Sequence, residues 1–219
     1  MGFWDTNSIN ASNLNRLGPL VDGVVGTGGQ YTDLYEAMTD GSGPQWNRVF
    51  VVDGATINGN VYKDGVARGC IIGVGMQSLT GTGEIRLNDC TEWHIENIRL
   101  NSTDTTAAAF TLQGSSGAYN ILRRCWAYQS GYNGFYITDA QRNRLIDCRA
   151  YDCDHSGVNI SATVGITWIR GLYSSNNDIN GIYDRGSSTH LTDSIIVSNT
   201  GDQIDASDET YYSNNQTSI

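Results

Sequence analysis

The sequence contains few prolines, few basic residues and no long apolar run. Its 219 residues include two prolines and 13 lysines and arginines against 23 acidic residues, giving a net charge of −10. That charge argues against binding nucleic acid through its phosphates. No stretch approaches the roughly 20 apolar residues that span a bilayer, so no membrane insertion is expected. Residues 1–20 lack a basic start followed by an apolar core, which predicts that no ordinary signal peptide directs export.

What the sequence does contain is a repeat that runs from Trp93 to Asn199. Five segments align when they begin at Ile95, Leu122, Leu145, Trp168 and Leu191, with spacings of 27, 23, 23 and 23 residues by subtraction. Apolar residues within each segment recur at every second position, the spacing of a strand with one buried face. Clusters of Gly, Asn, Asp and Ser separate these short strands. Such self-similarity is typical of a solenoid, in which stacked units share one core.

The repeat favours one kind of solenoid. Strands that recur once per repeat stack in parallel about 4.8 Å apart, which predicts a parallel β-helix. The stretch NRLIDCRAYDCDHSGVNI, residues 143–160, resembles the coils of right-handed, pectin-lyase-like β-helix proteins, including phage tailspikes and other virion proteins. The resemblance covers roughly residues 22–207 and implies an all-β, single-stranded parallel β-helix with a short N-terminal capping helix. Lyases, hydrolases, esterases, epimerases and tailspikes share this fold, so the resemblance leaves the activity open.

Four parts are expected along the chain. Residues 1–20 do not repeat and are predicted to form an arm that docks on this body, on another subunit or on a larger assembly. The large apolar residues of this arm are Trp4, Ile9, Leu14 and Leu17. Residues 21–47 contain the capping helix, for which Thr32 is the expected N-cap. The β-helix spans 48–207, and residues 208–219 form a C-terminal tail that caps the stack, extends to a partner or stays loose.

Metal ligands and disulfide patterns are scarce. The five cysteines contain no CxxC pair. Cys125 and Cys148 occupy equivalent positions in adjacent repeats and are expected to stack as buried free thiols, because in-register parallel side chains point the same way. His94 and His190 are equivalent too, but four repeats apart, too far to share an ion. We therefore expect neither a metal nor a cofactor.

Two details concern charged residues in the repeats. Asp184 stands in a column of apolar residues, so its strand either ends early at Ile182 or buries a partnered acid, and the following Arg185-Gly186 favours the early end. One outward column alternates in charge and predicts a salt-bridge ladder, in which each exposed pair stabilises by at most ~1 kcal/mol. This column consists of Asn97, Arg124, Asp147, Arg170 and Asp193.

Other outward positions predict a binding surface. A contiguous apolar patch is expected to form a subunit interface, and cyclic homotrimers are common among proteins of this resemblance. The residues of this patch are Ile146, Ile169, Leu172, Ile195 and Val197. Beside it, Trp126, Tyr128 and Tyr151 are candidates for carbohydrate binding, because aromatic rings stack on sugar faces. A third interpretation is that the chain's own termini cover this surface.

Catalytic residues are harder to identify. Glycoside hydrolysis needs two carboxylates about 5–9.5 Å apart, and the weak candidates are Asp154, His155 and Asp178, with Tyr132 in a neighbouring loop. Tight turns require the same residue types, and these loops are short. Enzymes that resemble this fold usually carry long loops that wall a groove. No catalytic residue is therefore assigned, and the interpretation leans towards a protein that is not an enzyme.

Together these features predict a trimeric, non-catalytic structural or binding protein of a virion, made in the host cytoplasm. It would be a tail spike or fibre component, or a capsid decoration subunit, joined to other virion proteins through residues 1–20. Two alternatives remain open. One is a polysaccharide lyase or hydrolase that depolymerises its substrate. The other is a carbohydrate-binding module that recognises a cell-surface polysaccharide.

Overall fold

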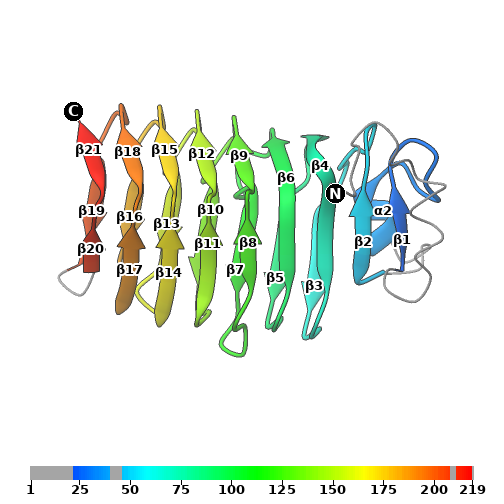
Figure 1. The fold of residues 1–219 in the computed structure, drawn as a ribbon, viewed down its shortest axis with the longest axis horizontal. Coiled ribbons are helices and arrows are strands. Elements are labelled where there is room, and N and C mark those ends of the chain that lie inside the picture. Colours follow the sequence, from blue (N-terminus) through cyan, green and yellow to red (C-terminus); the bar gives the residue numbers. More distant parts are fainter. Residues whose placement is uncertain (1–21, 40–45, 208–210, 219) are drawn as a thin grey trace, which may run out of the picture.

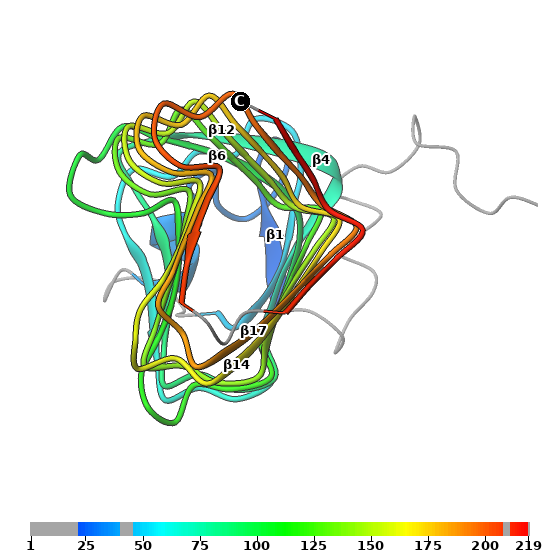
Figure 2. The same cartoon turned by 90° about the vertical axis from the view of Figure 1, so that its left-hand side faces the viewer.

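The computed structural model describes residues 22–39, 46–207 and 211–218. The chain winds into coils that stack along one axis, with the N-terminal coils at one end of the rod and the last coil at the other (Figure 1). Viewed along the axis, successive coils superpose around a common interior (Figure 2). All strand pairs are parallel, so the expected all-β parallel β-helix is confirmed. The proposed docking arm, with Trp4, Ile9, Leu14 and Leu17, lies outside the described residues.

The strands are short and follow one another around each coil. The N-terminal coils contain β1 (Gly23–Val25), β2 (Arg48–Val51), β3 (Val61–Asp64), β4 (Cys70–Gly81), β5 (Ile85–Asn88), β6 (His94–Ser102) and β7 (Phe110–Gln113). The next two coils contain β8 (Ile121–Arg123), β9 (Trp126–Tyr128), β10 (Phe135–Thr138), β11 (Asn143–Ile146), β12 (Arg149–Tyr151) and β13 (Val158–Ile160). The last coils contain β14 (Ile166–Arg170), β15 (Tyr173–Ser175), β16 (Ile182–Asp184), β17 (Ser188–Thr192), β18 (Ile195–Val197), β19 (Ile204–Ala206), β20 (Tyr211–Ser213) and β21 (Gln216–Ser218).

These strands form three rows along the rod. The first row is β8-β11-β14-β17-β20 and the second is β9-β12-β15-β18-β21; the long strand β6 joins both in one 14-stranded sheet. The third row is a seven-stranded sheet in the order β3-β5-β7-β10-β13-β16-β19. The solenoid therefore continues to β20 and β21, and the expected boundary between β-helix and tail at residue 207 is corrected by these two strands.

The core is a set of columns with one inward side chain per strand. Each large apolar residue buried in such a column contributes about 1.5–3 kcal/mol. In the third row the rings of Phe110 and Phe135 stack with centroids 5.2 Å apart. The inward column of the first row consists of Ile95, Leu122, Leu145, Ile169 and Leu191. Between the first two rows, the Cys125 and Cys148 thiols lie buried in one column as predicted, and burial raises the pKa of Cys125.

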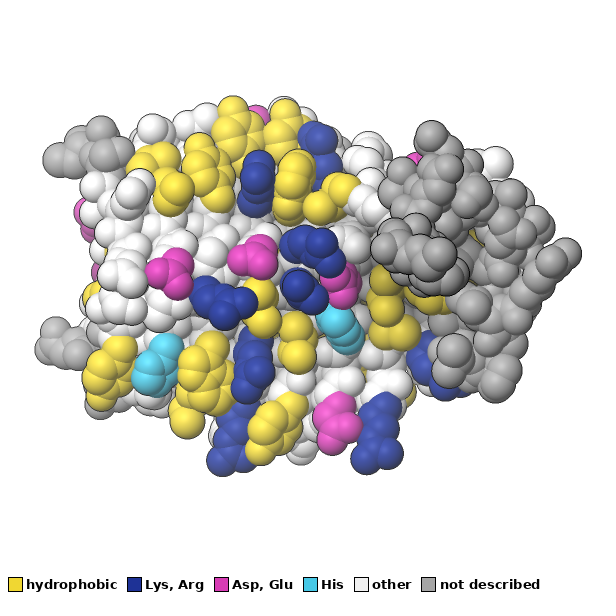
Figure 3. Space-filling model, viewed as in Figure 1, with side chains coloured by type: hydrophobic (Ala, Val, Ile, Leu, Met, Phe, Trp, Pro, Cys, Tyr) yellow, Lys and Arg dark blue, Asp and Glu magenta, His cyan; other side chains and the backbone are white. Residues whose placement is uncertain are grey.

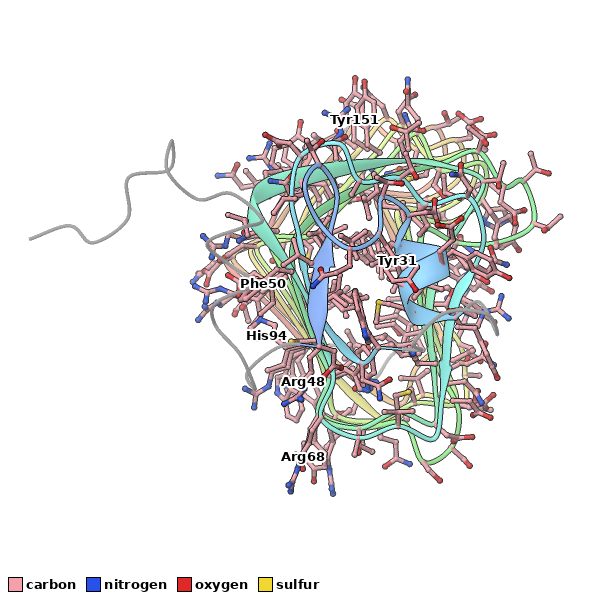
Figure 4. The ribbon with its side chains drawn as sticks, turned by 90° about the vertical axis from the view of Figure 1, so that its right-hand side faces the viewer. Tyr31, Arg48, Phe50, Arg68, His94 and Tyr151 are labelled. Atoms are coloured by element: carbon pink, nitrogen blue, oxygen red, sulfur yellow. The ribbon has the colours of Figure 1, made fainter. Side chains whose placement is uncertain are left out.

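A short helix covers the N-terminal end of this core. Helix α2 (Leu34–Met38) buries Leu34 and Met38 against the first coils. Its N-cap is Asp33 rather than the expected Thr32, because the Asp33 carboxylate accepts from the N–H groups of Tyr35 and Glu36 at 2.9 and 3.3 Å. Figure 4 looks onto this end, where β1 and α2 lie across the coil stack. No helix in the described part of the chain is long and apolar enough to span a bilayer.

The corners of the coils repeat an unusual backbone conformation. Between the first and second rows one residue per coil has φ between 50° and 66°, the left-handed region that costs most side chains roughly 1–2 kcal/mol. The residues of this corner column are Asn97, Arg124, Asp147, Gly171, Asp193 and Asn214. At Gly171 a Cβ would also lie 2.5 Å from Asp147 Oδ1. Both the positive φ and this close contact therefore favour glycine at this position. This sharp corner sets the second row at an angle to the first.

Two predictions about charged residues are wrong. Strand β16 reaches Asp184, whose fully buried carboxylate accepts from the Gly186 N–H at 2.8 Å, so the strand does not end at Ile182. The expected salt-bridge ladder does not form either, because Arg170 pairs in register with Ile146, and the corner position above Asp147 is taken by Gly171. Arg124 instead forms an ion pair with Glu96, which also lies 3.1 Å from His94 Nε2.

Candidate functional site

The candidate catalytic residues lie in exposed turns. Asp154 and Asp178 are exposed, and their N–H groups donate to Ser130 and Cys153 carbonyls of the preceding coil at 2.9 Å each. His155 is half-buried because its ring packs on Tyr132, with centroids 4.8 Å apart. None of the three candidates lines either of the two grooves described below. Their geometry is that of turn residues.

The predicted apolar interface is wrong at two of its five positions. Strand pairing places Leu145, Ile169 and Leu191 in one inward column, and Ile169 is 1% exposed. Leu172 is equally buried. The alignment that began one repeat at Trp168 is therefore one residue out of register, and Trp168 faces outward. Of the other members, Ile195 is exposed, whereas Ile146 and Val197 are half-buried.

The second row carries a groove lined mainly by aromatic and arginine side chains. We call it the Tyr128 groove, and its volume is about 370 Å³. It includes all three residues that the sequence suggested for carbohydrate binding and adds two arginines and a fourth aromatic ring. The lining residues are Arg99, Trp126, Ala127, Tyr128, Arg149, Tyr151 and Tyr173.

Stacking between coils fixes these side chains. Along one column of the second row, Arg99, Trp126, Arg149 and Tyr173 alternate cation and ring. The Arg149 guanidinium lies 4.4 Å from the Trp126 ring centroid and 5.9 Å from that of Tyr173. In the next column Tyr128 and Tyr151 stack with centroids 5.4 Å apart and planes inclined by 6°. Each cation–π contact at such an exposed site contributes about 0.5–1 kcal/mol, so the groove is largely preformed.

The arginines of this groove have no carboxylate partner. Among the described residues, neither Arg99 nor Arg149 takes part in an ion pair, and Arg99 Nε is buried without a hydrogen-bond acceptor. The Arg99 guanidinium instead lies 3.9 Å from the Tyr128 ring centroid. A surface with stacked rings and uncompensated guanidinium groups can hold a ligand that is both flat and anionic.

The first row carries a second groove, which the sequence did not reveal because of the register error at Trp168. We call it the Trp168 groove, and its volume is also about 370 Å³. Figure 3 shows two bands of apolar side chains on one side of the rod, separated by a band of charged side chains. The lining residues of the Trp168 groove are Arg144, Leu145, Ile146, Trp168, Ile169, Arg170, His190 and Thr192.

A buried carboxylate with a raised pKa lies in a different place, on the third row. Burial raises the pKa of Glu84, which is 1% exposed, and its Oε1 lies 2.6 Å from Arg86. The Thr111 hydroxyl donates to Glu84 Oε2 at 3.2 Å. Because Glu84 lies outside both grooves and is neutralised by Arg86, we interpret this pair as structural.

Comparisons with known proteins agree with this architecture. A family model described as the right handed beta helix region matches residues 80–218. Among solved structures, the periplasmic alginate epimerase AlgG superposes with a TM-score of 0.52 at 11% identity, over 78% of this chain and 47% of that one. A single-substitution mutant of the same epimerase gives 0.55 at 9% identity and 51% coverage of its chain. The present chain thus spans about half the length of these structures. A search of curated proteins finds no match.

Proposed function

Because the chain belongs to the right-handed β-helix family, we propose that it is a binding protein that holds a polysaccharide against its second row of strands, in the Tyr128 groove. The observation that carries this proposal is the ladder of Trp126, Arg149 and Tyr173, which places one planar group on each successive coil. A linear polymer that lies along the rod would meet the edge of one planar group at every coil.

The chemistry of the groove suits a sugar. The apolar faces of pyranose rings pack on aromatic rings, while their hydroxyl groups need hydrogen-bond donors at the edges of the site. Tyr151 offers the ring face that is not stacked on Tyr128, Tyr128 offers its edge between Arg99 and Tyr151, and Arg99 and Arg149 offer the donors. The preformed stack lowers the cost of ordering these side chains on binding. The similar AlgG structures are those of an alginate epimerase, which supports a polysaccharide ligand by analogy of fold alone.

Binding without cleavage fits the positions of the titratable groups. Asp154, His155 and Asp178 are turn residues outside the groove. A polymer in the Tyr128 groove would therefore not meet the candidate acid and base. A lyase or hydrolase activity remains the alternative, and the experiment below includes a test for shortened polymer.

The virion hypothesis stays a prediction that is compatible with this proposal. A trimeric tail spike, fibre or capsid decoration subunit, joined to other virion proteins through residues 1–20, would use the groove to recognise a cell-surface polysaccharide. The buried positions of Ile169 and Leu172 reduce the apolar area on which the trimer prediction was based. Light scattering on the full chain would give the molar mass and decide between monomer and trimer.

The experiment is affinity electrophoresis of the full chain in gels that contain neutral or acidic polysaccharides. We expect retention by at least one polysaccharide, weakened at least tenfold in Tyr128→Ala, because this variant removes the ring on which Arg99 and Tyr151 stack; a tenfold loss corresponds to about 1.4 kcal/mol. The control Tyr62→Ala removes an exposed tyrosine from the third row and should bind like the parent. Equal retention of the parent and Tyr128→Ala, or no retention by any polysaccharide, would overturn the proposal. Size-exclusion analysis of the recovered polymer should show unchanged chain length.

A further inference from the structure

The Trp168 groove is built from the same two kinds of side chain but on different residues. On the first row the Arg144 guanidinium lies 5.4 Å from the Trp168 ring centroid. The Trp168 and His190 rings stack at 6.2 Å with planes inclined by 18°. The run ends with Tyr211, whose ring stacks on His190 at 5.0 Å and 13°. Four successive strands, β11, β14, β17 and β20, thus each present one planar group in register.

From this arrangement we propose that the Trp168 groove is a second binding site, specific for an acidic polysaccharide. It takes its ligand class from the proposed function, but it depends on its own residues. One coil stack would then hold two polymer segments side by side, one on each side of the corner column.

The acidic character of the ligand follows from the charges. Arg144 and Arg170 line the groove, and neither takes part in an ion pair within the described residues. In the part of the chain that the structure describes, Arg99 and Arg149 of the neighbouring Tyr128 groove also form no ion pair, although the whole chain carries −10. An acidic protein that collects unpaired guanidinium groups along one surface attracts anions to that surface. Carboxylate or sulfate groups on a sugar would accept charge-assisted hydrogen bonds from these groups.

The stacked rings distinguish a polysaccharide from a small anion. Trp168 and His190 are half-buried, and Tyr211 is 62% exposed, so the outward edges of the stacked rings form an open strip rather than a closed pocket. Single-stranded nucleic acid also stacks on aromatic strips beside arginines. The polysaccharide ligand that we propose for the neighbouring Tyr128 groove favours a sugar polymer over a nucleic acid at this site. We therefore assign the groove to an acidic polysaccharide, and the test includes single-stranded DNA as a competitor.

The two grooves form separate sites on one surface. They share no lining residue, and the corner column, which includes Arg124 and Asp147, lies between the two rows that carry them. Figure 3 shows a band of charged side chains between two apolar bands. A long acidic polymer could occupy both by folding back, or two chains could be held by one protein. The first arrangement raises the apparent affinity for polymers over short oligomers, because the second contact of the same polymer becomes intramolecular.

The test is isothermal titration of the full chain with oligouronate of one defined length, too short to fold back. We expect two sites per chain for the parent and one for Trp168→Ala. Tyr128→Ala should also keep one site, and the double variant none. Arg144→Gln, which leaves the ring stack in place, should weaken the remaining site of Tyr128→Ala about tenfold. Higher salt should weaken oligouronate binding to Tyr128→Ala further, and a neutral dextran oligomer should not bind to this variant.

Each outcome separates this inference from the proposed function. If Trp168→Ala keeps the parent stoichiometry while Tyr128→Ala loses binding, the second site is refuted and the proposed function stands. If Tyr128→Ala binds like the parent and only Trp168→Ala is affected, the proposed site is refuted and the Trp168 groove stands alone. If single-stranded DNA displaces the oligouronate at equal concentration, the acidic-polysaccharide assignment is wrong. Circular dichroism of each variant must match the parent for these comparisons.

Discussion

Removing the amide of Asn177 is the substitution whose cost the structure defines most clearly. This side chain is fully buried between coils. Its Oδ1 accepts from the Cys153 N–H of the preceding coil at 3.2 Å. Its Nδ2 donates to Asn199 Oδ1 of the following coil at 2.7 Å and to the Ser174 hydroxyl at 3.0 Å. One amide therefore links three consecutive coils.

The partners that remain after Asn177→Ala set the magnitude. Asn199 Oδ1 still accepts from the Asn177 backbone N–H at 3.1 Å, and the Ser174 hydroxyl still donates to the Gly181 carbonyl at 2.9 Å. The Cys153 N–H loses its acceptor in a dry interior. One buried donor left unpaired costs about 1–3 kcal/mol. We therefore expect the free energy of unfolding to fall by about 2 kcal/mol, or the melting temperature by roughly 4–8 °C for a chain of this length.

Urea unfolding followed by tryptophan fluorescence measures this loss. The matched control is Asn176→Gly, which removes the neighbouring, exposed amide at a position with φ of 55° that glycine adopts readily. It should stay within about 0.5 kcal/mol of the parent or be slightly more stable. Because each coil contacts only its neighbours, hydrogen exchange should accelerate around β12, β15 and β18 and not at β2. A loss below about 0.5 kcal/mol in Asn177→Ala, or equal losses in both variants, would refute the reasoning.

Three further predictions concern packing, protonation and thiol reactivity. Gly181→Ala should lower the free energy of unfolding, measured in urea, by about 1–3 kcal/mol, because the new Cβ would lie 2.2 Å from Ile196 Cγ2. The control Gly165→Ala should be tolerated, because the nearest neighbour of its Cβ is a flexible side chain at 3.3 Å. Equal losses in the two variants would contradict this prediction. Burial lowers the pKa of Lys63 from 10.5 to about 8, so the unfolded chain binds this proton more tightly. As the pH rises from about 8 to 10.5, the unfolding free energy of the parent should therefore rise relative to that of Lys63→Met by up to ~3 kcal/mol. A difference between the two proteins that does not change with pH would show the reasoning to be wrong. Iodoacetamide should modify half-buried Cys70 before the four buried cysteines, as measured by peptide mass spectrometry. Equal rates of modification for all five cysteines would contradict this prediction.

The fold could be predicted because one physical requirement repeats in every coil. A column of buried residues such as Leu122, Leu145 and Leu191 must face inward in each turn, and that requirement creates the period. The register of one repeat could not be predicted, since Trp168 and Ile169 are adjacent and both apolar. The coil from Leu145 to Ile169 has 24 residues and the next has 22, so a constant period of 23 selects the wrong one of the two. A slip of one residue reverses every side chain of the strand.

The candidate site was therefore only partly visible in the sequence. Trp126, Tyr128 and Tyr151 were expected to face outward, and they line one groove. The role of Arg149 was missed, because its position between two rings depends on which residues meet across coils. The Trp168 groove was hidden by the register slip. Asp184 was misjudged because a burial partner, here the Gly186 N–H, cannot be recognised from residue type.

The corner column has a consequence for how this architecture can vary. Each coil turns at a left-handed corner residue and places its core and groove residues in register with the previous coil. Duplicating or deleting one complete coil should therefore lengthen or shorten both grooves by one strand, while the cross-section of the rod stays the same. Under the proposed function, the number of coils would therefore set how many sugar units one protein binds, and the length of the gene would set the length of the ligand segment.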